Sequence, residues 1–143
     1  MAKGPRKVVF ACVHNAGRSQ IASAIFNHLA DPARVVAVSA GTDPAPRVHP
    51  EVVTVMKELG IDLSRVRPRL LTDEVLRHAT AVVTMGCGDR CPFVEGARME
   101  DWPLPDPAGQ SVDAVRSLRD DILHRVKAMV EKEKWARLAP AKA

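Results

Sequence analysis

Short apolar runs alternate along the chain with stretches in which apolar residues recur every three or four positions. Residues 7–11 (KVVFA), 34–40 (RVVAVSA) and 80–85 (TAVVTM) form continuous apolar runs. Runs of this length without polar alternation are typical of strands that are covered on both faces. Residues 99–104 predict a short fourth strand. The chain therefore supplies the strands of a small, buried sheet.

The stretches between these runs have the apolar spacing of amphipathic helices. This spacing predicts helices over residues 19–30, 50–59 and 112–138. A short helix is expected over residues 72–77, where Thr72 and Glu74 supply the cap and the negative charge that favour a helix start. Asp31-Pro32 follows the first helix and Gly60 follows the second, and both are signals that end a helix. Residues 61–69 predict a connector, and residues 140–143 predict a frayed tail.

The alternation of strand and helix predicts an α/β fold. We expect right-handed βαβ units to build a single three-layer domain over residues 1–143, with a four-stranded parallel sheet flanked by helices. Ligands of such sheets bind beyond the carboxyl ends of the strands. Cys12 follows the first predicted strand, and the loop with Cys87 and Cys91 follows the third. All three cysteines are therefore expected at the ligand-binding edge.

Cys12 and Arg18 stand at the two ends of a C-x5-R-S loop between the first strand and the first helix. The backbone N–H groups of such a loop converge on one point, and the helix N-terminus adds partial positive charge. Gly17 permits a tight backbone path, and the planar fork of Arg18 suits a tetrahedral oxyanion. The same positive surroundings favour the nucleophilic thiolate of Cys12, to which Ser19 can donate its hydroxyl. The loop therefore predicts an anion held next to a nucleophile.

Two further features carry chemistry. Asp106 lies between Pro105 and Pro107, which restrict the backbone of a residue that has to be held over a pocket. Cys87 and Cys91 form a C-x3-C pair in a glycine-containing loop. This pair suits a redox relay, but half of a zinc site and two incidental thiols remain alternatives. No second cysteine pair or histidine pair completes four zinc ligands, so no metal is expected.

Composition excludes several other classes of protein. The 143 residues are 46% apolar and 27% charged, the balance of a globular domain, and no apolar stretch approaches the ~20 residues of a membrane span. The apolar run after the basic N-terminus is too short for a signal peptide, so a cytoplasmic protein is expected. The net charge is +4, but the basic residues are scattered and only five aromatic residues are present, so no nucleic-acid partner is expected.

The loop from Cys12 to Ser19 resembles the anion loop of the low-molecular-weight tyrosine phosphatase superfamily. More narrowly, the chain is similar to the bacterial arsenate reductases built on that fold. The resemblance covers nearly the whole chain, because Ser39-Ala40-Gly41, Thr84-Met85-Gly86-Cys87 and Asp106-Pro107-Ala108-Gly109 follow in the family's order. The additional pair of cysteines favours the reductase branch.

The resemblance implies reduction of arsenate to arsenite, as in arsenic detoxification. Cys12 would attack arsenic, and Asp106 would protonate the departing oxygen. Cys87 would then attack Cys12 and release arsenite, and Cys91 would attack Cys87, so that thioredoxin could reduce the resulting Cys87–Cys91 disulfide. The oxyanion, arsenate or a phosphate or sulfate in its place, would be held by the loop residues Val13, His14, Asn15, Ala16, Gly17, Arg18 and Ser19. No bound cofactor and no partner beyond the reductant are implied, and a monomer is expected.

Several departures from the family keep alternatives open. The three-residue spacer between Cys87 and Cys91 is shorter than in thioredoxin-coupled members, and the motifs also resemble members that use mycothiol and a glutaredoxin-like partner, for which Cys12 can suffice. Ser23 stands where potassium-binding members have glutamate, so no potassium is expected. A tyrosine phosphatase is the rival enzyme, although the chain has no tyrosine to line its cleft. An oxyanion- or arsenite-binding redox sensor is the rival without catalysis.

Overall fold

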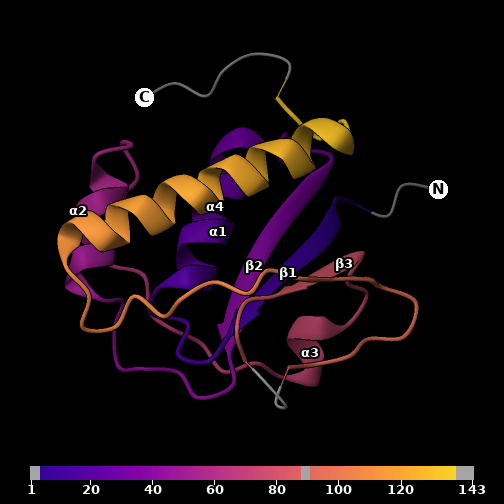
Figure 1. The fold of residues 1–143 in the computed structure, drawn as a ribbon. Coiled ribbons are helices and arrows are strands. Elements are labelled where there is room, and N and C mark those ends of the chain that lie inside the picture. Colours follow the sequence, from indigo (N-terminus) through magenta and orange to yellow (C-terminus); the bar gives the residue numbers. More distant parts are fainter. Residues whose placement is uncertain (1–3, 88–90, 138–143) are drawn as a thin grey trace.

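The computed structural model describes residues 4–87 and 91–137 (Figure 1). Along these residues the elements are β1 (Arg6–Cys12), α1 (Arg18–Leu29), β2 (Val35–Gly41), α2 (Pro50–Lys57), α3 (Asp73–Leu76), β3 (Ala81–Thr84), β4 (Arg98–Asp101) and α4 (Val112–Lys132). The predicted tail over residues 140–143 and the middle of the loop between Cys87 and Cys91 lie outside the described residues.

The strands form one parallel sheet with the order β2-β1-β3-β4. Val8, Val9, Phe10 and Ala11 of β1 are completely buried, because β1 is a central strand with a covering layer on each face. In the register of the sheet, Cys12 lies opposite Gly41 of β2. The prediction of an α/β fold with a four-stranded parallel sheet is confirmed.

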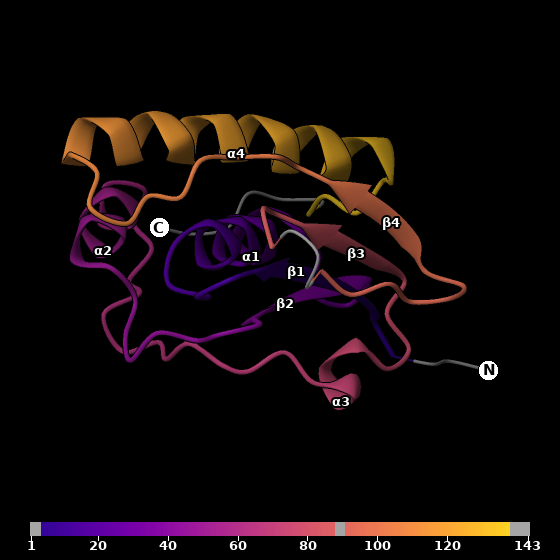
Figure 2. The same ribbon diagram turned by 60° about the horizontal axis from the view of Figure 1, so that its bottom comes forward.

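The sheet lies between two unequal layers (Figure 2). On one face α1 packs against β1 and β2, and α4 packs across α1. The connection from β2 to β3 begins with α2, which packs against α4, and then crosses to the opposite face of the sheet. That face is covered by the short helix α3 and the irregular chain that leads to it (Figure 2).

The predicted helix over residues 112–138 is too long, because α4 ends at Lys132. Lys134 has a left-handed backbone with φ of 61°. This turn places Trp135 in the core, with its ring 6.0 Å from that of Phe26, and allows Ala136 to bridge Ala30. Burial of the indole and the new backbone bonds therefore override a helical pattern that contains no glycine or proline to stop it. Leu138 itself lies outside the described residues.

Smaller differences occur at the other boundaries. Cys12 is the last residue of β1 and not the first residue of the loop, and α1 begins one residue early, at Arg18. The fourth strand covers Arg98–Asp101, and pairing with β3 ends where the Trp102 N–H donates to Thr84 O at 2.8 Å. Pro103 lacks the N–H that would continue the ladder. Within the described residues, no helix has the length and apolar character that crossing a membrane requires.

Candidate active site

The loop that connects β1 to α1 turns its carbonyl groups away from its own centre. Val13 O accepts from Asp43 N–H at 2.8 Å, His14 O from Ala45 N–H at 3.0 Å and Ala16 O from His49 N–H at 3.0 Å. In a trans peptide, the N–H of the next residue points opposite to the carbonyl. The loop N–H groups on these peptides therefore face inward, as required for binding an oxyanion.

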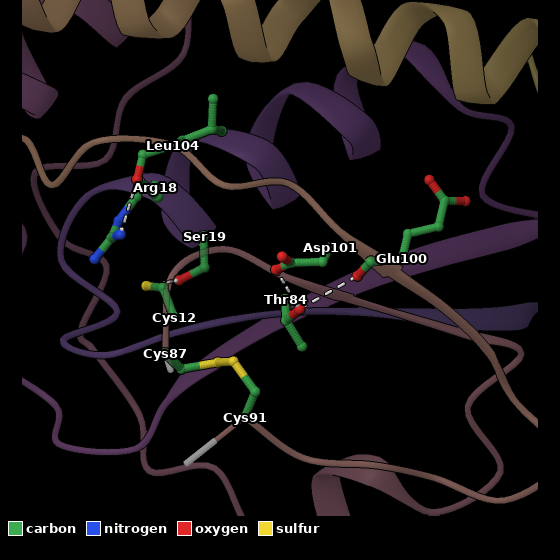
Figure 3. The surroundings of a disulfide bond; sticks show 9 residues. All are labelled: Cys12, Arg18, Ser19, Thr84, Cys87, Cys91, Glu100, Asp101 and Leu104. Carbon is green, nitrogen blue, oxygen red and sulfur yellow. Dashed lines mark hydrogen bonds between the residues drawn. A yellow bond between two sulfur atoms is a disulfide. The ribbon is translucent and has the colours of Figure 1, made fainter. Parts of the chain in front are cut away.

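The Cys12 side chain lies at the base of this loop and is only 2% exposed. Its Sγ is 2.8 Å from Ser19 Oγ in the first turn of α1 (Figure 3). A thiolate can only accept a hydrogen bond, so the Ser19 hydroxyl is the donor when Cys12 is ionised. The contact expected from the sequence between Ser19 and the sulfur is present.

Asn15 holds Ser19 in the orientation that this donation needs. The backbone N–H of Arg69 donates to Asn15 Oδ1 at 2.9 Å, and an N–H can only donate, which fixes the orientation of the amide. Asn15 Nδ2 therefore donates to Ser19 Oγ, at 2.7 Å, and leaves the hydroxyl hydrogen free for sulfur. Gln20 Nε2 also donates to Asn15 Oδ1, at 3.0 Å. The φ of 50° at Asn15 is a left-handed conformation that this network maintains.

Arg69 and Gln20 were not identified from the sequence. The contribution of Arg69 is a backbone N–H, which every residue except proline has, so no residue type could reveal it. Gln20 lies in the predicted helix directly after the loop, where a glutamine is an ordinary helix former. Only the packing of residues 69–71 along β2 brings the N–H of Arg69 to the loop, where Gly41 N–H donates to Arg69 O at 2.9 Å.

Arg18 is buried at the mouth of the loop, and one of its N–H donors has no hydrogen-bond partner. Its Nη1 donates to Leu104 O at 3.1 Å, and its Nη2 lies 3.9 Å from Asp106 Oδ2. Among the described residues, Arg18 Nε is one of two buried side-chain nitrogen or oxygen atoms without a hydrogen-bond partner. An unpaired buried donor is costly, and an anion in the loop would satisfy it.

Two glycines determine the space around Arg18. A Cβ on Gly86, which follows β3, would collide with Arg18 Nη1. A Cβ on Gly17 would collide with Pro107, so Gly17 allows the Asp106 segment to pack against the loop. The guanidinium is thus held between the end of β3 and the segment that carries Asp106 and Leu104.

Asp106 is at the rim of the site, with its side chain 44% exposed. Its Oδ1 accepts from the Ala108 N–H at 2.9 Å, which orients the carboxyl group. Its Oδ2 faces Arg18, so the carboxyl group has one oxygen directed toward the anion loop. A carboxyl group in this position, reachable by water and close to the centre of the loop, could exchange a proton with the leaving oxygen of an anion bound there.

Cys87 and Cys91 are joined by a disulfide at the same edge of the sheet, with their Cα atoms 4.9 Å apart (Figure 3). Cys87 is buried and Cys91 is half-buried, whereas Cys12 is a free thiol. The Met85 N–H donates to Ala11 O at 2.8 Å, which places Met85 beside Cys12 and Cys87 only two residues further along. Residues 4–87 and 91–137 contain no group of three or more side chains arranged to hold a metal.

The side chain of His14 lies on the outer side of the loop and does not face its centre. Its Nδ1 lies 3.0 Å from Asp43 O on the exposed side of the loop. The structure therefore brings together Cys12, Asn15, Arg18, Ser19 and Asp106 as side chains. Val13, His14, Ala16 and Gly17 contribute backbone.

Comparisons with known proteins identify the family to which the chain belongs. The profile of the family described as low molecular weight phosphotyrosine protein phosphatase matches residues 7–138. The chain belongs to this family. Within it, the chain is similar to proteins named as arsenate reductases, as expected from the sequence motifs.

Two curated relatives illustrate this similarity. A Halobacterium salinarum protein named "Putative arsenate reductase" is 41% identical over 131 residues, which are 87% of this chain and 91% of the relative. The "Glutaredoxin arsenate reductase" of Synechocystis is 32% identical over 130 residues, 89% of this chain and 98% of the relative.

A solved structure resembles the fold as well. The thioredoxin-dependent arsenate reductase of Corynebacterium glutamicum superimposes with a TM-score of 0.80 and 38% identity. The similarity covers 94% of this chain and 64% of the other, so the chain spans about two thirds of the length of that structure.

Proposed function

We propose that the chain is an enzyme that reduces arsenate to arsenite, with Cys12 as the nucleophile and Cys87 and Cys91 as a thiol relay. The observation that carries the proposal is the combination of a buried thiol in an anion loop with a disulfide at the end of the neighbouring strand. The arsenate reductases among the relatives support this choice over the other activities of the fold. Phosphate and sulfate have the same tetrahedral shape and are expected to bind in the loop as competitors.

In the first step, the Cys12 thiolate attacks arsenic and forms a sulfur–arsenic bond. An arsenic–oxygen bond breaks, and the Asp106 carboxylic acid gives its proton to the departing oxygen, which leaves as water. Arg18 and the inward N–H groups of the loop balance the negative charge on the remaining oxygens. The buried Nε of Arg18 gains an acceptor in this complex.

In the second step, the Cys87 thiolate attacks the sulfur of Cys12. The electron pair of the sulfur–arsenic bond stays with arsenic, so arsenic is reduced and leaves as arsenite while a Cys12–Cys87 disulfide forms. Cys91 thiolate then attacks Cys87, and Cys12 leaves as a thiolate ready for another cycle. Each exchange needs a thiolate and an in-line approach to the disulfide. The disulfide of the structure, with Cys12 free, corresponds to the end of this sequence.

We infer that thioredoxin supplies the electrons that reopen the Cys87–Cys91 disulfide. Support comes from the thioredoxin-dependent enzyme of Corynebacterium glutamicum, the solved structure described above. The glutaredoxin-named relative from Synechocystis supports the second candidate, a glutaredoxin-like protein together with a small thiol such as mycothiol. In that route the small thiol attacks the arsenic adduct on Cys12, and Cys91 is dispensable.

The test is catalytic reduction of arsenate, followed by NADPH consumption with the thioredoxin system and, separately, with the mycothiol system. Cys12→Ser is expected to abolish turnover with both. Cys87→Ser and Cys91→Ser are expected to abolish turnover with thioredoxin. Full activity of Cys91→Ser with thioredoxin would refute the intramolecular relay, and the absence of turnover with both systems would refute arsenate reduction. Stoichiometric arsenite binding without turnover would instead indicate a redox sensor.

Phosphatase activity is a further candidate because the family profile is that of phosphotyrosine phosphatases. Hydrolysis of a phosphate ester needs Cys12, Arg18 and Asp106 but neither Cys87 nor Cys91. Turnover of p-nitrophenyl phosphate that survives Cys87→Ser would demonstrate it. We expect this activity to be weak, because no tyrosine is available to stack on a phenyl ring.

A further inference from the structure

A cavity opens at the amino-terminal end of the sheet, opposite to the end that carries Cys12. Its volume is about 790 Å³, and it is lined by Gly4, Pro5 and Arg6 at the start of β1 and by His78 and Thr80 before β3. These two segments lie at the same end of the sheet (Figure 2), where Thr80 N–H donates to Lys7 O at 2.8 Å. Cys12 is six residues beyond Arg6 on the same strand, so about 20 Å of extended chain separate the cavity from the anion loop. The cavity is therefore not part of the candidate active site.

The polar side chains that line the cavity can all donate hydrogen bonds, and no carboxylate is among the lining residues. Arg6 offers its guanidinium, His78 a ring N–H and Thr80 a hydroxyl. Within residues 4–87 and 91–137, none of these three side chains forms a hydrogen bond or an ion pair. Arginines elsewhere on the surface are paired, as Arg116 is with Glu58 at 2.7 Å. The donors around the cavity are therefore free to bind the oxygens of an anion.

Positive charge continues from the cavity to its neighbours along the chain. Lys7 follows Arg6, and the exposed Arg77 precedes His78. Burial, followed by the nearby charges of Arg77 and Arg69, lowers the pKa of Lys7, while Glu74 acts in the opposite sense. The cations at this end of the sheet thus lie close enough to repel one another, and a bound anion would relieve that repulsion.

The backbone of His78 has a left-handed conformation that is uncommon for a residue with a Cβ. Its φ is 63°, in the turn that follows α3, where Ala79 N–H donates to Leu76 O at 3.1 Å. This turn places His78 on the wall of the cavity. Unfavourable backbone conformations of this kind cluster at ligand-binding sites. Since no hydrogen bond of the imidazole within the described residues offsets the strain, the conformation points to a ligand that the ring contacts.

We propose that this cavity binds a polyphosphate group, with Arg6, His78 and Thr80 as donors and with Lys7 and Arg77 as additional positive charge. A single oxyanion would fill a small part of a cavity of about 790 Å³, whereas a chain of phosphates brings several negative charges and acceptor oxygens to donors on both walls. Free polyphosphate and the polyphosphate group of a nucleotide present the same chemistry to these side chains. Binding here involves none of the three cysteines, so the inference goes beyond the proposed function and does not depend on it.

The test is a titration of the full chain with inorganic triphosphate, followed through the NMR signals of the backbone amides. Cys12, the free cysteine, is first alkylated with iodoacetamide so that the anion loop is blocked. Shifts of the amide signals are expected at Arg6, His78 and Thr80 and not over residues 13–19. Absence of shifts at the cavity with both inorganic triphosphate and ATP would overturn the proposal.

The titration with ATP distinguishes the two sources of the polyphosphate group. A Kd for ATP that is lower than that for inorganic triphosphate, or higher by less than about tenfold, would indicate a nucleotide. Weaker binding of ATP, by about tenfold or more, would indicate a free polyphosphate, because the nucleoside would then be hindering access to the cavity. Either result supports the site, since the same amides respond.

Removal of single charges tests whether the cations of the cavity hold the ligand. Arg6→Ser and Arg77→Ser are each expected to raise the Kd for triphosphate about three- to tenfold. Arg65→Ser is the matched control, because Arg65 is equally exposed, does not line the cavity and acts on the pKa of Asp62 instead. It is expected to leave the Kd within about twofold of wild type in 0.15 M salt, where distant charges are screened. Equal effects of all three substitutions would show attraction by net charge alone and would overturn the proposal.

Replacement of His78 by glycine separates binding from folding. Glycine adopts a φ of 63° without strain, so His78→Gly is expected to unfold at a temperature no lower than that of wild type. The same variant loses the imidazole and is expected to bind triphosphate about threefold or more weakly. Wild-type affinity in a folded His78→Gly would contradict the proposed contact with the ring. None of these measurements contains arsenate, so their outcome is independent of arsenate reduction.

Discussion

Replacement of Gly86 by alanine tests whether the end of β3 positions Arg18, the arginine proposed to bind the anion. Gly86 has φ of +92°, and a Cβ there would collide with Arg18 Nη1. Gly96 provides a matched control, because its φ is +87° but a Cβ would meet nothing within 4 Å. Both substitutions strain the backbone in the same way, and only Gly86→Ala displaces the guanidinium.

The magnitudes follow from the two separate effects. An alanine in the left-handed region costs about 1–2 kcal/mol, so both variants are expected to lose similar stability. Displacement of Arg18 removes a charge-assisted hydrogen bond to the bound oxyanion, which contributes about 1.5–3 kcal/mol. Since about 1.4 kcal/mol corresponds to a tenfold change in Kd, Gly86→Ala is expected to weaken anion binding roughly 10- to 100-fold.

The assay is titration calorimetry with inorganic phosphate, which occupies the loop without being reduced. Thermal unfolding of the same samples measures the strain. Gly96→Ala is expected to unfold at a lower temperature than wild type and to bind phosphate with unchanged Kd. If Gly86→Ala bound phosphate as tightly as Gly96→Ala, the assignment of Gly86 as the neighbour that positions Arg18 would be wrong.

Three further perturbations address the thiol, the acid and the fold. Ser19→Ala removes the hydroxyl next to Cys12 and is expected to slow alkylation by iodoacetamide about three- to tenfold, since loss of thiolate is partly offset by its greater nucleophilicity. Asp106→Asn is expected to slow single-turnover release of arsenite about 100-fold while phosphate still binds. Hydrogen bonds from Arg116 and then Arg119 lower the pKa of Glu58 from 4.5 to about 2. The stabilisation from Glu58 is therefore present above about pH 4.5 and disappears as the pH falls toward about 2.

Each of these predictions has its own control. Ser23→Ala, one turn further along α1, leaves the contacts of Cys12 intact and is expected to be alkylated at the wild-type rate. Loss of phosphate binding in Asp106→Asn would indicate a disturbed loop and not a missing acid. The difference in unfolding temperature between wild type and Glu58→Gln is expected to be constant near neutral pH and to shrink in acid. A difference as large at pH 2 as near neutral pH would contradict the role of the ion pairs.

The sequence alone determined the sheet and most helices, and it predicted the candidate chemistry of the loop, because these depend on local pattern. An apolar run without alternation is buried in whatever fold it forms. Cys12 ends β1 and Arg18 begins α1, so the residues between them form the strand-to-helix loop that a βαβ unit requires. The sequence pattern placed the end of α4 too late, because a tertiary contact and not the local pattern ends this helix. The pattern continues beyond Lys132, and only the burial of Trp135 against Phe26 ends the helix.

Tertiary structure decided which distant groups complete the site. The N–H of Arg69, the carbonyl of Leu104 and the missing side chain of Gly86 hold Asn15 and Arg18 in place. Two of these are backbone groups, which do not depend on the type of side chain. The sequence shows that residue 86 is a glycine, but not that its missing Cβ leaves room for Arg18. Their role depends on where chain segments cross, which packing across the whole sheet determines. The sequence thus predicted the candidate nucleophile and the candidate anion loop, and the fold supplied the contacts that orient them.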